Sequence, residues 1–200
     1  RGVRTRDTLL AAEAVADTGT PCVVMTYWNL VEHYGVDAYA RDLASAGGAG
    51  LITPDLTPDE AKEWMAASEA HGLDRVFLVA PSSTDERLAS TVAACRGWVY
   101  ATSVMGVTGT RAQTSSAAPE LVARVKAVNS EIPVGVGLGV SNGDQAAEVG
   151  SFADGVIVGS ALVRALVEAE EQGETAHIGI DRMRTIVDDL VSGVRRARLQ

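Results

Sequence analysis

Short apolar segments rich in β-branched residues alternate with longer amphipathic segments, with a period of about 25 to 30 residues. Continuous apolar runs of this kind are typical of strands buried on both faces of a parallel sheet. The predicted strands are Cys22–Tyr27, Gly50–Thr53, Arg75–Ala80, Trp98–Ser103, Val134–Val140 and Gly155–Val158. The predicted helices are Thr5–Ala16, Val36–Ala46, Pro58–His71, Thr84–Arg96, Pro119–Asn129, Gly143–Val149, Ala161–Leu166 and Ile180–Arg196. This alternation indicates repeated βαβ units.

Two architectures fit the alternation, a doubly wound sheet and a (β/α)8 barrel. The barrel typically needs about 250 residues and eight strands. The chain opens at Arg1 on a helix that lacks a strand of its own, so we expect about two further strands upstream of it. The sequence therefore favours an α/β (β/α)8 TIM barrel, with about six of its eight βα units in a single partial domain over residues 1–200.

Several predicted helices begin or end with residues that are typical of helix caps. Thr57-Pro-Asp-Glu60 predicts a capping box with Pro at the first helical position, and Ser83-Thr-Asp-Glu86 predicts a second box. Gly72 and Gly97 are expected to end helices in the left-handed conformation.

Composition and charge narrow the possible partners. Seventeen Lys and Arg residues against 26 Asp and Glu give a formal net charge of −9, which disfavours nucleic acid and anionic membranes. No run of about 20 apolar residues exists that could span a bilayer. Cys22 and Cys95 stand apart without a C-x-x-C partner and predict buried thiols in a reducing compartment.

Three glycine-bearing segments lie at the carboxyl ends of the last three predicted strands: Met105–Gly109, Gly135–Gly139 and Gly159-Ser160. Glycine inside a strand costs about 0.5–1 kcal/mol relative to Ala, so the pattern calls for a reason such as close approach of a ligand to the backbone. Gly159-Ser160 also opens a helix, whose free N–H groups and dipole favour a phosphate. Taken singly, each segment is better explained by packing or turn glycines. The glycines of Gly135–Gly139 do not fit a dinucleotide-binding fold, because no third glycine stands at the required spacing and no acidic residue ends a following strand.

Five motifs together resemble the α subunit of tryptophan synthase. They are Met25–Asn29, Leu51–Asp55, Ser103–Gly109, Pro133–Val140 and Asp154–Ala161, in the family's order and spacing. The similarity extends from Arg1 to about Leu166, and Gly-Val-Thr-Gly with the paired late glycines is its most specific part.

The resemblance implies roles for individual residues. The substrate phosphate would be held by Gly109, Gly139, Gly159 and Ser160. The substrate pocket would include Tyr27, Ile52, Asp55, Tyr100, Thr108 and Leu138, with Thr108 on a mobile loop. Asn29 matches a position at the interface with the β subunit. From the residues alone, Tyr27 and Tyr100 could be core residues or ligand contacts, and Asn29 a turn residue.

The acid and base that the family uses are expected upstream of Arg1, as a glutamate and an aspartate near the second strand. Retro-aldol cleavage requires two positioned carboxyl groups with separated pKa values. Asp55 is the only carboxylate that follows a predicted strand in this chain. Asp154 precedes a predicted strand and is therefore expected at the opposite end of the barrel. We expect no catalytic residue in this chain and no activity from the chain alone. His33 on a loop, His71 at a helix end and His177 are expected at the surface, and no metal site is predicted.

The resemblance implies a lyase of tryptophan biosynthesis that cleaves indole-3-glycerol phosphate to indole and glyceraldehyde 3-phosphate. It implies a cytoplasmic heterotetramer with a β subunit, and no cofactor in this chain, because pyridoxal phosphate would belong to that partner. Two alternatives stay open: another phosphate-binding barrel enzyme, and a non-catalytic α-like protein that only activates a β subunit.

Overall fold

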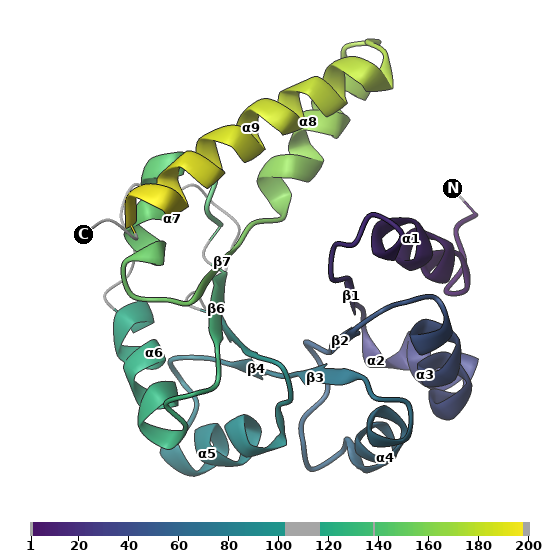
Figure 1. Cartoon of the computed structure of the whole chain (residues 1–200), viewed down its shortest axis with the longest axis vertical. Coiled ribbons are helices and arrows are strands. Elements are labelled where there is room, and N and C mark those ends of the chain that lie inside the picture. Colours follow the sequence, from purple (N-terminus) through teal and green to yellow (C-terminus); the bar gives the residue numbers. More distant parts are fainter. Residues whose placement is uncertain (1, 103–116, 138, 198–200) are drawn as a thin grey trace. The chain divides into compact units, whose positions relative to one another are not determined.

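The structure is a computed structural model that describes residues 2–102, 117–137 and 139–197 (Figure 1). It divides into two compact units, the first formed by residues 1–79 and 84–99 and the second by residues 80–83 and 100–200. Helices and strands alternate along the chain in both units. The single-domain organisation stays a prediction.

The first unit contains a parallel three-stranded sheet, counted over the described residues, with the order β1-β2-β3. Its strands are β1 (Val23–Met25), β2 (Gly50–Ile52) and β3 (Asp74–Val76). Its helices are α1 (Asp7–Ala16), α2 (Trp28–Tyr34), α3 (Val36–Ser45), α4 (Lys62–Ala70) and α5 (Asp85–Ala94). Register pairs Met25 with Ile52, so β1 and β2 end side by side.

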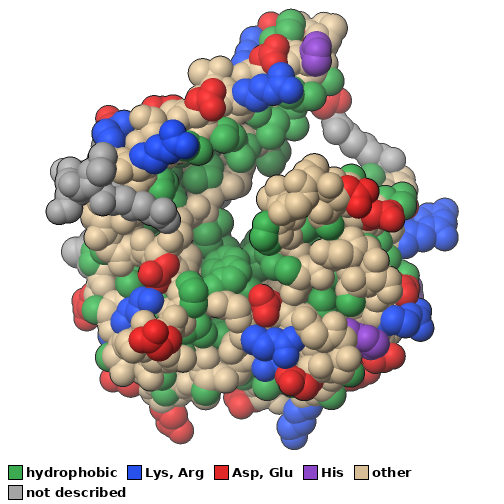
Figure 2. All heavy atoms as spheres, in the orientation of Figure 1, with side chains coloured by type: hydrophobic (Ala, Val, Ile, Leu, Met, Phe, Trp, Pro, Cys, Tyr) green, Lys and Arg blue, Asp and Glu red, His purple; other side chains and the backbone are tan. Residues whose placement is uncertain are grey.

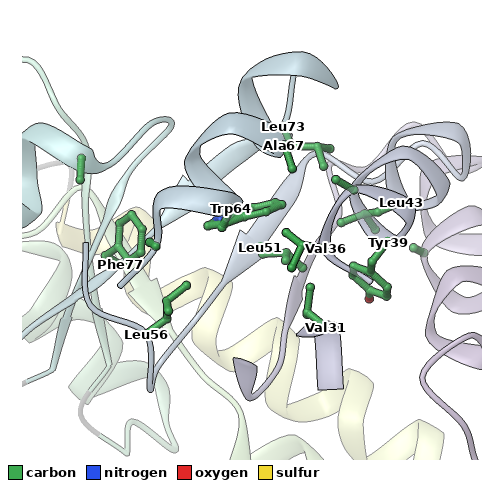
Figure 3. Packing of buried hydrophobic residues seen from close by; sticks show 14 residues of the cluster. Val31, Val36, Tyr39, Leu43, Leu51, Leu56, Trp64, Ala67, Leu73 and Phe77 are labelled. Carbon is green, nitrogen blue, oxygen red and sulfur yellow. The ribbon is translucent and has the colours of Figure 1, made fainter. Parts of the chain in front are cut away.

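A single hydrophobic cluster joins the helices of this unit to its strands (Figure 3). Trp64 of α4, Tyr39 and Leu43 of α3, and Leu51 of β2 are almost fully buried in it. Each such side chain contributes about 1.5–3 kcal/mol by leaving water. The Tyr39 hydroxyl shares a hydrogen bond of 3.0 Å with Thr8 Oγ1, which ties α1 to α3.

A second sheet has four strands among the described residues, in the order β4-β5-β6-β7. They are β4 (Leu78–Val79), β5 (Val99–Thr102), β6 (Val134–Gly137) and β7 (Gly155–Ile157). The helices of the second unit are α6 (Ala117–Val128), α7 (Gly143–Gly150), α8 (Ser160–Glu171) and α9 (Ala176–Ala197). β6 and β7 are parallel and pair Gly137 with Ile157.

Helices α7 and α9 are joined by a polar contact at a point where their backbones meet. The Gly143 amide donates to Asp189 Oδ2 at 2.6 Å, and Arg196 of α9 forms an ion pair with Asp144 at 2.7 Å. A Cβ added at Gly193 would lie 2.6 Å from the Gly143 carbonyl carbon, so a glycine is required there. Helix α9 therefore provides a hydrogen-bond acceptor for the first residue of α7.

Several exposed apolar side chains lie along the pair α8 and α9, where Figure 2 shows hydrophobic atoms at the surface. Val163 and Val167 of α8 and Val187 and Val191 of α9 are between 41% and 59% exposed. In the part of the chain that the structure describes, no helix is long and apolar enough to cross a membrane.

The predicted strands are confirmed, with one difference. The segment predicted as Arg75–Ala80 forms two strands that meet at the buried Phe77, because β3 pairs within the first sheet and β4 within the second. The positive φ angles expected at Gly72 and Gly97 are also confirmed, at 69° and 92°.

Three helix predictions are wrong. Helix α2 was not predicted, so His33 lies in a helix instead of a loop. Helix α4 begins at Lys62 and not at Pro58, because Thr57 Oγ1 bonds to the Glu60 carboxylate at 2.9 Å and the four residues form a turn. Thr84, and not Ser83, caps α5 by accepting from the Arg87 amide at 3.3 Å.

The structure shows the surroundings of two histidines that were expected at the surface, His71 and His177. His71 follows α4, as predicted, but its Nε2 lies 2.9 Å from Asp37 Oδ1 and its side chain is 24% exposed, so it is not a freely solvated residue. His177 lies on α9 and is exposed, as expected. Helices α8 and α9 are both longer than predicted: α8 extends to Glu171 through alanine and glutamate residues, which favour helix, and α9 begins at Ala176.

Asp154 links the segments that lead into β6 and β7. Its carboxylate accepts from the Val134 amide and from Lys126 Nζ, both at 2.8 Å. Partial burial opposes ionisation, but these two hydrogen bonds and the charge of Lys126 outweigh it and hold the pKa of Asp154 below its usual value.

We predict that Asp154→Asn lowers the free energy of unfolding by about 1 kcal/mol at pH 7, a modest loss because the group is half exposed. Since the folded pKa is lowered, the stabilisation is present above the unfolded pKa of about 4 and disappears as pH falls through the folded pKa. Urea unfolding between pH 7 and pH 3 measures it. Asp144→Asn, which breaks a fully exposed ion pair, is the control and should cost less. A difference between wild type and Asp154→Asn that stays constant with pH would contradict the prediction.

Candidate functional site

In the first unit, the predicted site residues Tyr27 and Ile52 lie at the carboxyl ends of β1 and β2. The Thr26 amide donates to the Ile52 carbonyl at 3.2 Å, so the two strands stay paired up to their carboxyl ends. Ile52 is 7% exposed, whereas Tyr27, two residues past β1, is 65% exposed. The structure therefore brings Tyr27 and Ile52 to the same edge of the sheet, as the sequence predicted.

Asp55 and Asn29 lie just beyond this edge. The Trp28 amide donates to both Asp55 carboxylate oxygens, at 3.0 and 3.1 Å, so the loop after β2 is bonded to the first residue of α2. Asn29 is the next residue of α2, and its side chain is exposed. Its predicted contact with a partner, and the predicted place of Asp55 in the substrate pocket, stay predictions.

In the second unit, the predicted site residue Tyr100 lies on β5, beside the glycines of β6. Burial raises the pKa of the half-buried Tyr100 phenol. A Cβ added at Gly137 would lie 2.9 Å from two ring carbons of Tyr100 and closer still to its hydroxyl. Gly137 is therefore a glycine because the Tyr100 ring occupies the space that a side chain would need.

We predict that Gly137→Ala lowers the free energy of unfolding by about 1–3 kcal/mol through overpacking against Tyr100. Gly155→Ala is the matched control on the neighbouring strand, because its nearest atom would be the Gly135 Cα at an ordinary 3.8 Å. Urea midpoints of both variants measure the difference. Combining Gly137→Ala with Tyr100→Ala should recover at least about 0.5 kcal/mol relative to additivity. Strict additivity would mean that the ring is not the obstacle.

Gly139, Gly159 and Ser160 form an open corner at the carboxyl ends of β6 and β7. Gly139 adopts a φ of +70°, which disfavours other residues, and Gly159 is the N-cap of α8. A Cβ added at either glycine would meet no atom of the described chain within 4 Å. These glycines therefore border open space, where a ligand can approach the backbone.

Helix α8 directs its N-terminus at this corner. The first intrahelical bonds are donated by Leu162 and Val163 to the Gly159 carbonyl, at 3.0 and 3.2 Å. No hydrogen bond is recorded for the Ser160 and Ala161 amides within the described residues. Two free N–H donors at the positive end of a 12-residue helix favour an anion.

A pocket of about 540 Å³ lies within the second unit, against the corner. It is lined by Gly139, Ser141, Ser160, Ala161, Arg164, Ala165, Glu168, Arg182, Thr185 and Ile186. Sequence reasoning did not find the α9 part of this lining, because α9 is distant in sequence and carries no motif. Arg164 could have been suspected, since it lies one helical turn after Ser160 on the same face. Arg182 is paired with Glu174 at 2.8 Å.

Three predicted site residues lie outside the described residues: Thr108, Gly109 and Leu138. The structure places none of them.

The remaining reactive side chains do not assemble a further centre. No group of three or more His, Cys, Asp or Glu residues in the described ranges could hold a metal ion. Cys22 and Cys95 are unpaired thiols, and burial raises the pKa of Cys95 to about 11, which makes it unreactive at neutral pH. Asp154 precedes β7 and so lies at the end opposite to the glycine corner.

The structure thus defines an α/β protein with parallel strands. Tyr27 and Ile52 lie at one edge of the sheet in the first unit, and an open glycine corner follows β6 and β7 in the second. The model of the family described as tryptophan synthase alpha chain matches residues 1–191. The tryptophan synthase alpha chain of Mycobacterium marinum is 64% identical over 195 residues, which cover 98% of this chain and 68% of that relative.

Two solved structures show the same likeness. A structure of Mycobacterium tuberculosis tryptophan synthase matches 97% of this chain and 70% of its own, with 64% identity and a TM-score of 0.87. A mutant tryptophan synthase alpha-subunit from Pyrococcus furiosus matches 95% of this chain and 74% of its own, with 29% identity and a TM-score of 0.82. The chain belongs to the tryptophan synthase alpha chain family, which confirms the resemblance and the (β/α)8 fold class predicted from its motifs.

Proposed function

We propose that the glycine corner holds the phosphate of indole-3-glycerol phosphate. Gly139, Gly159 and Ser160 would bind its oxygens through backbone N–H groups, together with Gly109 from outside the described residues. The observation that carries this proposal is the corner itself, where two glycines border open space at the start of α8. We further propose that Tyr27, Ile52, Tyr100, Leu138 and Thr108 would contact the indole and glycerol parts of the substrate.

The reaction follows from family membership. A tryptophan synthase alpha chain is a lyase of tryptophan biosynthesis, and it cleaves indole-3-glycerol phosphate into indole and glyceraldehyde 3-phosphate. Holding the phosphate gives binding energy that can orient the distant carbon–carbon bond. Cleavage then needs one group to protonate the indole carbon and another to accept a proton from the glycerol arm. The family assignment favours this lyase over another barrel enzyme or a non-catalytic activator.

We propose the family's setting for the protein as well. Its partner would be a tryptophan synthase β subunit in a cytoplasmic heterotetramer, with Asn29 at the interface. This chain would bind no cofactor, and pyridoxal phosphate would belong to the β subunit. The exposed position of Asn29 at the start of α2 supports a role in contact with a partner.

We predict that Gly159→Ala weakens binding of glycerol 3-phosphate at least about tenfold, because the new methyl group occupies the space of the phosphate. Stability should be nearly unchanged, since that methyl group meets no protein atom within 4 Å. Isothermal titration calorimetry measures the affinity and a thermal melt the stability. Gly155→Ala, outside the pocket lining, is the control and should bind like wild type. Equal affinity in all three proteins would place the phosphate elsewhere.

We predict that the 200-residue chain alone releases no measurable indole from indole-3-glycerol phosphate. Each missing acid or base lowers the rate by about 10²–10⁴-fold, and the two effects combine. Chromatographic detection of indole measures turnover. A segment that carries the family's acidic pair, supplied in trans or by fusion, should restore it. Turnover by the chain alone, abolished by Asp55→Asn, would instead make Asp55 the catalyst.

A further inference from the structure

The N-terminus of α2 lacks a capping group of its own. Its N-cap residue is Tyr27, whose side chain accepts no bond from the helix. The backbone of Tyr27 is extended, with φ −68° and ψ 143°, so the chain turns into the helix directly at Trp28. The first amides of a helix have no intrahelical acceptor and need a partner from elsewhere.

Asp55 supplies that partner from a different loop. Both of its oxygens accept from the Trp28 amide, across a sequence separation of 27 residues. This is the geometry of a side chain that caps the N-terminus of a helix. A carboxylate used in this way offers no proton to a substrate carbon.

The residues on either side of Trp28 are those with proposed functional roles. Tyr27 precedes it and is assigned to the substrate, and Asn29 follows it and is assigned to the partner. Both side chains are exposed, while Trp28 is partly buried against the hydrophobic cluster of the first unit. The peptide that Asp55 accepts from therefore lies directly between the two residues with proposed roles.

We propose that Asp55 is a positioning residue: its carboxylate caps α2 and so fixes the orientation of Tyr27 toward substrate and of Asn29 toward the β subunit. This inference rests on the proposed function and deepens it. It assigns Asp55 a role without proton transfer. The position of Asp55 after β2, taken alone, would instead suggest a catalytic residue. Asn can accept the same hydrogen bond, whereas Ala cannot.

The first arm of the test follows the hydrogen bond itself in the 200-residue chain. Hydrogen exchange at the Trp28 amide should be about fivefold faster in Asp55→Ala than in wild type, and close to wild type in Asp55→Asn. Asp59→Ala is the matched control. Asp59 is an exposed carboxylate in the same loop, and no hydrogen bond of its side chain is recorded among the described residues. Unchanged exchange in Asp55→Ala would overturn the inference.

The second arm follows function in the 200-residue chain supplied with the segment that carries the acidic pair, in the presence of a tryptophan synthase β subunit. Binding is measured with the probe indole-3-propanol phosphate, which cannot be cleaved because its side chain lacks the glycerol hydroxyl groups. Asp55→Ala should raise KM and weaken binding of the probe by about tenfold with little change in kcat, because positioning is lost and the chemistry remains. Asp55→Asn should restore both values to within about threefold of wild type.

The outcomes separate the two proposals. If the unsubstituted protein of the second arm neither binds the probe nor releases indole, the proposed function is refuted. Wild-type activity combined with a large loss of kcat in Asp55→Asn at unchanged probe affinity shows that Asp55 transfers a proton, which overturns the positioning role alone. Wild-type KM in Asp55→Ala also overturns it.

Discussion

Parallel pairing of neighbouring strands determines where this protein can bind a ligand. In each sheet the strands end at a common edge, and the register fixes which residues meet there. β1 and β2 pair Met25 with Ile52, which brings Tyr27 beside the end of β2. β6 and β7 pair Gly137 with Ile157, and Gly139 and Gly159 each lie two residues beyond that pair. The glycine corner is thus a direct product of register, and a shift of one residue in either strand would separate its two halves.

The strands could be predicted because each is a continuous apolar run with a turn signal at both ends. The same reasoning could not find α2, which has seven residues and begins at a tyrosine without a capping side chain. It also misjudged Thr57–Glu60, where a capping-box pattern forms a turn because the two side chains bond to each other. A short pattern identifies the residues that can bond, but competition among their partners decides the geometry.

The site could be predicted only in part, for a related reason. Gly135, Gly137 and Gly139 look equivalent in the sequence, yet their surroundings differ. Gly137 leaves room for the Tyr100 ring, whereas Gly139 has a positive φ and borders open space. The bond from Trp28 to Asp55 and the α9 side of the pocket join residues distant in sequence, and no local pattern marks them. The motifs therefore predicted where an anion could bind, while packing distinguishes the surroundings of each glycine.

The junction of α7 and α9 has a consequence for the order in which the protein can mature. Gly143 begins α7, and the carboxylate that accepts from its amide belongs to Asp189, 46 positions further along the chain. A ribosome makes the glycine corner, α7 and β7 before it makes this acceptor, and domains generally fold as their residues emerge. Asn142 already caps α7 by accepting from the Gln145 amide, so the contact with Asp189 is a second one that forms only after α9 has been made. Helix α9, which also lines the pocket through Arg182, Thr185 and Ile186, therefore joins α7 only after the glycine corner has been made.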